Sequence, residues 1–437
     1  MNFNQLPLHE RILKAVADTG YTKPTPIQLK AIPKVAKGAD VIGIAQTGTG
    51  KTAAFTLPLL SKLVDKTEAN ESRHTRVLII APTRELVQQI HENVRGYAKY
   101  TNLRTGVIIG GVSDKGQIAK LNSGVDILVA TPGRLLDLVE KGHGNFHQIE
   151  ALVLDEADRM LDMGFIPDIR TIVKKLPKSK QTLLFSATLN SQIESLTKEF
   201  LNSPTLIEVE RRASPADTIE QIIYEIQDHQ KTELLEHLLN SSHEFYAVMV
   251  FARTKLGAEE LSTALKMEGF TAEAIHGDRS QGQRKRALDD FKKGKVRVLV
   301  ATDVAARGID VDSITHVINY DFPEQSEDYI HRIGRTGRAG AKGVAITFVT
   351  QRNQQALKKV EKLIQKTLPK KIVEDFEYDQ STPEPIRRPV SKVAPKSGRT
   401  GDYQNKFANR KNNAGAKRPG GSGNKRKSNT GKTRRKK

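Results

Sequence analysis

The chain has 437 residues, no cysteine, 37% hydrophobic residues and a formal net charge of +20. The lack of cysteine excludes disulfides, thiol catalysis and thiolate metal sites, and it is compatible with a reducing compartment. No signal-peptide pattern and no apolar run of roughly 18 residues is visible, so we expect a soluble, cytoplasmic protein without a membrane partner. The length predicts two or three domains.

The first 200 residues contain short apolar runs separated by helical patterns. Continuous apolar strands that alternate with helices predict βαβ units and a parallel sheet covered on both faces. The expected strands are 41–44, 77–80, 107–109, 127–130, 152–154 and 183–185. We expect a first α/β domain at residues 30–207, after an N-terminal region of residues 1–29.

The stretch after the first expected strand has the pattern of a phosphate-binding loop. It consists of Ala45, Gln46, Thr47, Gly48, Thr49, Gly50, Lys51 and Thr52, and it precedes a helix expected to run to about residue 63. Gly48 and Gly50 permit a tight turn in which several backbone N–H groups point at one anion. Lys51 would neutralise the β- and γ-phosphates, and Thr52 could bind Mg²⁺. The general pattern has glycine at position 45, and an ordinary strand–turn–helix corner is the alternative.

Carboxylates follow the expected strand 152–154. Asp155, Glu156 and Asp158 lie where the carboxyl end of a parallel strand faces the ligand crevice of an open α/β sheet. Asp155 is suited to hold Mg²⁺, and Glu156 to orient or deprotonate an attacking water. The alternative is an ordinary acidic helix N-terminus.

A second α/β domain is expected over residues 218–379, after a linker at 208–217. Pro204 and the stretch 213–217 have the composition of a linker. Its apolar runs are 222–226, 247–251, 298–300, 316–318 and 345–349, followed by an amphipathic helix at 351–368. This half has no phosphate-binding loop of its own, so we expect one nucleotide for two domains of similar fold. Residues 380–437 have the composition of a disordered tail, and residues 387–437 hold 18 of the 70 Lys and Arg residues with one acid, Asp402.

The tetrad Asp155-Glu156-Ala157-Asp158 and the surrounding motifs resemble the DEAD-box ATP-dependent RNA helicases of superfamily 2. The resemblance runs from Phe3 to about Ile372, and alanine at position 45 is usual in that family. The matching motifs, in the family's order, are 20–28 (its Q motif), 45–52, 82–86, 110–111, 131–134, 155–158, 186–188, 251–254, 276–278, 281–284, 301–303, 306–310 and 331–338. The resemblance implies two tandem RecA-like domains with mainly parallel sheets, ATP and Mg²⁺ as cofactors and RNA as partner. The arrangement is similar to the RhlE-type bacterial branch.

The resemblance also implies residues that bind and hydrolyse ATP. Gln28 has a side-chain amide that suits the edge of adenine, and Phe3 or Tyr21 would stack on the base. Asp310 would accept a hydrogen bond from a ribose hydroxyl. From the second domain, Arg335 and Arg338 would reach the γ-phosphate as arginine fingers, so that hydrolysis requires closure of the two domains.

The implied RNA contacts are small, hydroxylated or guanidinium groups, which bind phosphate and ribose and carry no base information. They are Arg84, Gly111, Thr131, Arg134, Gly277, Arg284 and Thr302. Coupling between the domains is implied for Asp158, Ser186, Thr188 and His331. Arg134 could instead be a surface charge of a helix, and the two hydroxyls could be ordinary caps. The tail would tether RNA non-specifically or act only as a solubilising appendage.

We therefore expect RNA-stimulated ATP hydrolysis coupled to local unwinding of short RNA duplexes or to remodelling of RNA–protein complexes. An ATP-gated RNA clamp or assembly platform uses the same residues and is the alternative. A DNA helicase is a third possibility, which the Q motif and the acidic tetrad disfavour.

Overall fold

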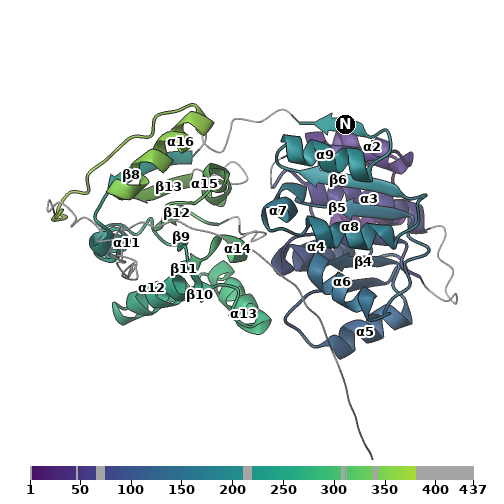
Figure 1. Cartoon of the computed structure of the whole chain (residues 1–437), viewed down its shortest axis with the longest axis horizontal. Helices are drawn as coiled ribbons and strands as arrows, with labels where there is room; N and C mark the ends of the chain where they lie inside the picture. The colour runs from purple at the N-terminus through teal and green to yellow at the C-terminus, as the bar shows by residue number, and fades with distance from the viewer. Residues whose placement is uncertain are drawn as a thin grey trace, which may run out of the picture. The chain divides into compact units, whose positions relative to one another are not determined.

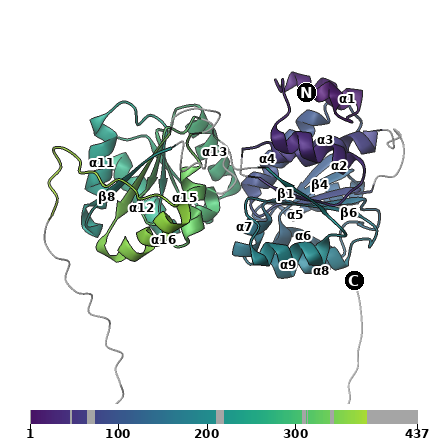
Figure 2. The ribbon, with the colours of Figure 1, turned by 90° about the horizontal axis from the view of Figure 1, so that it is seen from above.

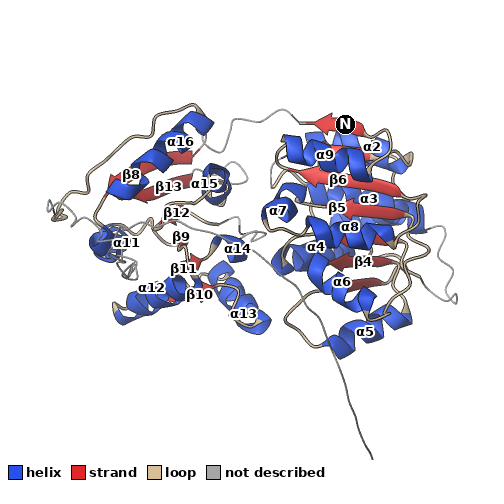
Figure 3. Cartoon of the chain, viewed as in Figure 1, coloured by secondary structure: helices blue, strands red, loops and turns tan. Residues whose placement is uncertain are grey.

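Two parallel β-sheets organise the chain (Figures 1 and 3). The structure is a computed structural model that describes residues 2–45, 48–64, 74–209, 219–306, 311, 313–337 and 343–379. The first sheet has seven strands in the order β3-β4-β2-β5-β6-β1-β7, and the second has six in the order β10-β11-β9-β12-β13-β8. All strand pairs in both sheets are parallel. The prediction of two α/β domains with parallel sheets is therefore confirmed.

The first domain alternates strands and helices along the chain. Its strands are β1 (Val41–Ile44), β2 (Val77–Ile80), β3 (Thr105–Ile108), β4 (Ile127–Ala130), β5 (Ala151–Leu154), β6 (Gln181–Ser186) and β7 (Thr205–Glu208). Its helices are α1 (Glu10–Asp18), α2 (Pro26–Ala36), α3 (Lys51–Val64), α4 (Arg84–Tyr97), α5 (Asp114–Ser123), α6 (Pro132–Glu140), α7 (Ala157–Asp162), α8 (Ile166–Lys174) and α9 (Ser191–Phe200), with a 3-10 turn η1 (Phe3–Gln5).

The second domain repeats this alternation. Its strands are β8 (Ile219–Glu225), β9 (Val248–Phe251), β10 (Ala272–Ile275), β11 (Val298–Ala301), β12 (His316–Asn319) and β13 (Gly343–Val349). Its helices are α11 (Lys231–Ser241), α12 (Lys255–Met267), α13 (Gln281–Lys292), α14 (Asp303–Ala306), α15 (Ser326–Ile333) and α16 (Gln354–Ile364), with 3-10 turns η2 (Asp228–Gln230) and η4 (Gln351–Asn353).

Helices cover both faces of each sheet (Figure 2). Along β2, Val77 and Ile79 pack into one apolar cluster with residues of α1 to α4. Leu78 and Ile80 pack into the other cluster, with residues of α5 to α9. Because successive side chains of a strand point to opposite faces, a strand buried on both sides must be apolar throughout. This is why the strands could be predicted from continuous apolar runs.

The two domains share one strand order. When the strands of the second sheet are numbered from one in chain order, the sheet has the order 3-4-2-5-6-1, which is the order of the first sheet without β7. The common topology supports the prediction of two domains of similar fold, for which the sequence shows no clear repeat.

Two strands were missed by the sequence analysis, and one prediction was wrong. Pro204 was expected to belong to the linker, whereas β7 begins at the next residue and pairs in parallel with β1. Only Ile207 of β7 is buried, so this edge strand has little apolar signal. The other missed strand, β10, contains a glutamate and two alanines.

The C-terminal end of the second domain is also more divided than predicted. The single helix expected at 351–368 is the turn η4 followed by α16.

Among the described residues no helix is both long and apolar enough to cross a membrane. Most of the predicted linker and the whole predicted tail, residues 380–437, lie outside the described residues.

Candidate functional site

The carboxyl ends of three neighbouring strands bring the predicted ATP-site segments together. β6 pairs with β1 on one side and with β5 on the other. The phosphate-binding loop follows β1, Asp155 and Glu156 follow β5, and β6 ends at Ser186. Since the strands are parallel, these three segments lie at the same edge of the sheet.

Lys51 opens helix α3 and is almost completely buried, with 6% of its surface exposed. Within the described residues, its ammonium nitrogen has no hydrogen-bond partner. Burying an unpaired ammonium is costly unless a counter-charge or acceptor is supplied. The helix N-terminus beside it adds further positive charge, so this position is suited to an anionic ligand.

Asp155 is buried at the end of β5. Burial raises the pKa of its carboxyl group to about 6, and the positive charge of Lys51 opposes this shift. Thr52 is half-buried in the first turn of α3. A carboxylate and a hydroxyl are oxygen ligands of the type that Mg²⁺ prefers, so these two residues fit a magnesium ion.

Glu156 has a strained backbone. Its φ of 53° and ψ of 53° place it in the left-handed region, which costs on the order of 1–3 kcal/mol for a residue other than glycine. Its backbone N–H donates to Oδ1 of Asp155 over 3.0 Å. Such strain persists where the surrounding structure holds it and is concentrated at functional sites.

Asp158 connects the segment after β5 to the segment after β6. Its Oδ2 accepts hydrogen bonds from the backbone N–H of Ala187, over 3.1 Å, and from the hydroxyl of Thr188, over 3.4 Å. The N–H of Thr188 donates in turn to the hydroxyl of Ser186 over 3.4 Å. Three of the four residues predicted to couple the domains therefore form one hydrogen-bonded group.

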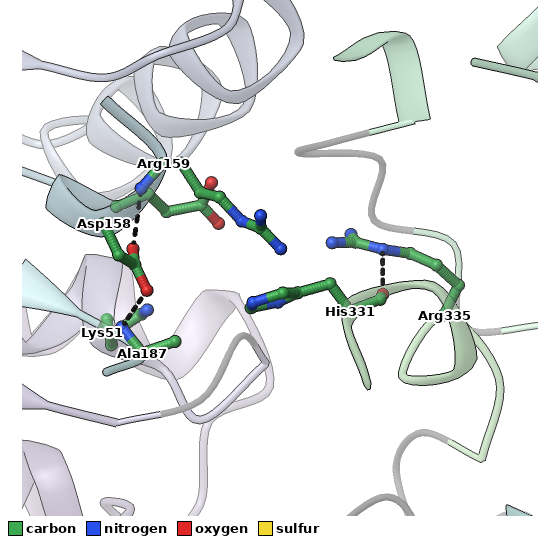
Figure 4. Close-up of a pocket in the computed structure, with 7 residues that line it drawn as sticks. Lys51, Asp158, Arg159, Ala187, His331 and Arg335 are labelled. Carbon is green, nitrogen blue, oxygen red and sulfur yellow. Dashed lines mark hydrogen bonds between the residues drawn. The ribbon is translucent and has the colours of Figure 1, made fainter. Parts of the chain in front are cut away.

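A small cavity contains residues of both domains (Figure 4). Its lining is Lys51, Glu156, Asp158, Arg159, Ala187, His331 and Arg335. His331 lies in the last turn of α15, and Arg335 follows that helix. Nε of Arg335 donates to the carbonyl oxygen of His331 over 3.3 Å. The cavity thus places a guanidinium of the second domain beside the lysine and carboxylates of the first.

Gln28, the predicted adenine-binding residue, is buried in the first turn of α2. Its Oε1 accepts from the N–H of Thr25 over 2.9 Å, and its Nε2 donates to the carbonyl oxygen of Gly50 over 3.1 Å. An amide oxygen has two lone pairs and an amide nitrogen two protons. The side chain therefore keeps one donor and one acceptor beyond these two bonds.

The aromatic residues predicted to stack on adenine lie against each other. Phe3 and Tyr21 are stacked, with ring centroids 6.2 Å apart and an interplanar angle of 20°. Phe3 is buried, whereas Tyr21 is 41% exposed. The Tyr21 hydroxyl lies 3.2 Å from that of Tyr97. Tyr21 therefore offers the more accessible ring face of the two.

Five of the seven predicted RNA contacts line one groove of about 290 Å³: Arg84, Thr131, Arg134, Gly277 and Arg284. Gly111 lies next to it, with a φ of +76°, where an added Cβ would clash with the guanidinium of Arg84. Thr302 is buried before α14 and does not line the groove. The groove also has apolar lining residues, Met163, Phe165, Val304 and Ala305, which the sequence analysis missed.

Two arginines of this groove are paired with carboxylates. Nη2 of Arg284 lies 2.6 Å from Oε2 of Glu85, and both side chains are buried. Nη1 of Arg134 donates to Asp137 over 2.6 Å, and its Nη2 donates to Asp114. Arg134 is therefore more than an isolated surface charge. A phosphate entering this groove would meet guanidinium groups that are already oriented.

Some predicted residues cannot be placed, and others were not predicted. Gln46, Thr47, Asp310 and Arg338 lie outside the described residues. Glu85 belongs to the predicted motif 82–86 but was given no role of its own, and Arg159, which directly follows Asp158, was missed. In the sequence, both residues were visible only as a charge next to a residue of opposite charge, Arg84 or Asp158. Their actual partners, Arg284 and Asp328, are distant in sequence, so the sequence could not reveal them.

Two parallel α/β domains, with a phosphate-binding loop beside an acidic segment, define a two-domain nucleotide-binding protein. Residues 25–196 match the family described as DEAD/DEAH box helicase, and residues 230–340 match the helicase conserved C-terminal domain. The chain belongs to the DEAD/DEAH box helicase family.

Curated relatives agree with this assignment. The chain is 46% identical over 366 residues to the ATP-dependent RNA helicase CshA of Listeria monocytogenes, covering 84% of this chain and 69% of the relative. It is 44% identical over 364 residues to DEAD-box ATP-dependent RNA helicase 30 of Arabidopsis thaliana, covering 83% and 62%. The chain thus spans about two thirds of the length of these relatives.

Solved structures show the same fold. The structure of S. cerevisiae Dbp5 bound to RNA and ADP BeF3 has a TM-score of 0.76 and 32% identity, covering 85% of this chain and 95% of that chain. The structure of Mss116p bound to ssRNA and AMP-PNP has a TM-score of 0.76 and 30% identity, covering 84% and 78%.

Proposed function

We propose that this chain is an ATP-dependent RNA helicase, whose ATP hydrolysis is stimulated by RNA and drives local unwinding of short duplexes or remodelling of RNA–protein complexes. Membership of the family supports this proposal. The names of the curated relatives, and the RNA and nucleotide analogues in the similar structures, point the same way. The cavity that combines Lys51 and Glu156 with Arg335 carries the proposal for this chain itself.

The phosphates of ATP would lie against Lys51 and the N-terminus of α3. The buried ammonium without a partner supports this role, because a triphosphate supplies the missing acceptors. Thr52 and Asp155 would hold Mg²⁺, which neutralises phosphate charge when it is bound. Gln28 would bind adenine with its remaining donor and acceptor, and Tyr21, with Phe3 behind it, would pack on the base.

Glu156 would orient and deprotonate the attacking water. Its position beside Asp155, in the same cavity as Lys51, supports this role. Arg335 would stabilise the charge that develops on the transferred phosphoryl group, as an arginine finger. Arg338 and Asp310 belong to the same proposal through the family motifs alone. Hydrolysis would then require the second domain to reach the nucleotide bound by the first.

RNA would bind in the groove lined by Arg84, Arg134 and Arg284, mostly through its backbone. Gly111, Thr131, Gly277 and Thr302 would add backbone and hydroxyl contacts. Asp158, Ser186, Thr188 and His331 would connect this groove to the ATP site. Because ATP and RNA would both prefer the closed arrangement of the domains, each would favour binding of the other.

The test is ATP hydrolysis by the full chain with and without RNA, followed by strand displacement on a short RNA duplex. RNA should raise the rate, and single-stranded DNA of the same sequence should not. Equal hydrolysis with and without RNA would refute the proposal. RNA-stimulated hydrolysis without strand displacement would favour the ATP-gated clamp.

The proposal also includes the domain boundaries, the cellular location and the branch of the family. The domain boundaries at 30–207 and 218–379 rest on sequence composition; the two separate sheets support the division into two domains, while α2 begins before residue 30 and β7 ends at Glu208. We also propose a cytoplasmic location, where the proposed substrates ATP and RNA are both available. The RhlE-type branch rests on the arrangement of the Q motif and the basic tail.

A further inference from the structure

Arg159 joins the two domains through a buried ion pair. Its Nη1 donates to Oδ1 of Asp328 over 2.8 Å, across 169 positions of sequence. The side chains of Arg159 and Asp328 are 5% and 12% exposed. The same Nη1 also donates to Asp162, one turn further along α7, over 3.1 Å, but Asp162 is 50% exposed.

Each partner of this ion pair lies next to a residue that is predicted to couple the two domains. On the first domain, Arg159 follows Asp158, whose Oδ1 accepts the backbone N–H of Arg159 over 3.0 Å. On the second domain, Asp328 lies in the first turn of α15. His331, three residues later, is on the same face of that helix, and it lines the cavity that also contains Arg335.

Helix α15 is itself fixed within the second domain. Arg332 donates to both carboxylate oxygens of Asp303, over 2.6 and 2.7 Å. It also donates to Oδ1 of Asn319 over 3.2 Å and to the carbonyl oxygen of Asp321 over 2.6 Å. Because α15 cannot move independently of its sheet, a bond to its first turn holds the whole domain.

We infer that Arg159 is a positioning residue: its ion pair with Asp328 is a latch that forms on domain closure and sets the position of Arg335 at the ATP site. The inference rests on the proposed function. In an open arrangement the two side chains would be apart and hydrated. The ion pair can therefore form only when closure brings them together, and their mutual attraction then offsets the cost of desolvating both charges. Arg159 itself would not touch the nucleotide.

The decisive variants are isosteric and matched. Asp328→Asn removes the charge of the partner in the other domain, and Asp162→Asn makes the same change in the partner on the same helix. Closure is measured by energy transfer between dyes on Lys175→Cys and Met267→Cys, two exposed positions. The chain has no cysteine of its own, so the dyes react only at these two introduced positions.

We expect wild-type protein to change its energy transfer on adding RNA with AMP-PNP. Asp328→Asn and Arg159→Gln should each need about tenfold more RNA for half-maximal closure, and the double variant also about tenfold rather than a hundredfold. Asp162→Asn should stay within about twofold of the wild type. The reversed pair, Arg159→Asp with Asp328→Arg, should recover part of the loss.

The outcomes separate this inference from the proposed function. If wild-type protein does not close with RNA and AMP-PNP, the proposed function fails and the latch fails with it. If wild-type protein closes and Asp328→Asn closes as readily as Asp162→Asn, the latch alone is refuted. A hundredfold loss in the double variant would show that Arg159 and Asp328 act independently, which also refutes the latch.

Discussion

The side chain of Gln28 donates a hydrogen bond to the carbonyl oxygen of Gly50 over 3.1 Å, which ties the start of α2 to the phosphate-binding loop. Gly50 has a φ of +88°, and an added Cβ would clash with the Gln28 amide. The residue proposed to bind adenine therefore also supports the loop proposed to bind the phosphates. Under the proposed function, base recognition and loop geometry would be coupled through this one amide.

Replacing Gln28 should weaken ATP binding. Gln28→Leu removes the bonds to Gly50 and Thr25 and leaves two partly buried backbone groups without their partners, which costs about 1 kcal/mol or more. We expect the ATP concentration for half-maximal hydrolysis to rise about tenfold or more. Titration of ATPase activity measures this. Gln148→Leu, at an exposed glutamine, is the control. Unchanged ATP dependence in Gln28→Leu would contradict the coupling.

The left-handed backbone at Glu156 should lower the stability of any variant with a residue other than glycine at this position. Because its backbone is left-handed, Glu156→Gly should unfold with a free energy about 1 kcal/mol higher than Glu156→Ala. Thermal or denaturant unfolding of the two variants measures the difference. Equal stabilities would show that the left-handed backbone is relieved in solution.

Glu156→Gln keeps the size of the side chain and removes its basicity. The turnover number of RNA-stimulated hydrolysis should fall by about 10²–10⁴-fold. ATP binding, followed by a fluorescent nucleotide analogue, should change little because Lys51 and the loop are intact. A turnover number within tenfold of wild type would exclude Glu156 as the general base.

Stability should fall in mild acid because of His316. This residue is buried against Phe245, with ring centroids 4.0 Å apart, and burial lowers its pKa to about 4 from 6.5. Between pH 6.5 and 4 the unfolded chain binds a proton that the folded chain does not. The contribution of neutral His316 to the free energy of unfolding is therefore complete above pH 6.5. It is lost as the pH falls from 6.5 to 4, by at most about 3 kcal/mol.

His316→Phe retains an aromatic ring and cannot titrate, so its unfolding free energy should depend less on pH between 6.5 and 4. His147→Gln, at an exposed histidine, should keep the wild-type dependence. Denaturant unfolding at several pH values measures both. An identical slope in His316→Phe and in the wild type would assign the acid sensitivity to other groups, of which His91 is a candidate because burial also lowers its pKa to about 4.

The basic tail should strengthen RNA binding in a salt-dependent way. Deleting residues 387–437 removes 18 Lys and Arg residues, so RNA affinity should fall and its dependence on salt should flatten. Hydrolysis of ATP without RNA should be unaffected. Binding titrations at several salt concentrations measure the slope. The same slope with and without the tail would leave it only a solubilising role.

The sequence alone determined the features that depend on neighbouring residues. Strands β1, β2 and β4 coincide with predicted apolar runs, because burial on both faces requires continuous apolar residues. The glycine-rich loop and the acidic tetrad could likewise be recognised from a few adjacent residues, because their chemistry is carried by short spacings.

Only the tertiary structure decided the features that depend on distant residues. The edge strand β7 forms because β1 offers it hydrogen bonds, although only Ile207 of its four residues is buried. The pairs Gln28–Gly50, Arg284–Glu85 and Arg159–Asp328 join separate elements. A charged or amide side chain has many possible partners in a sequence, and packing of the sheets and helices selects one.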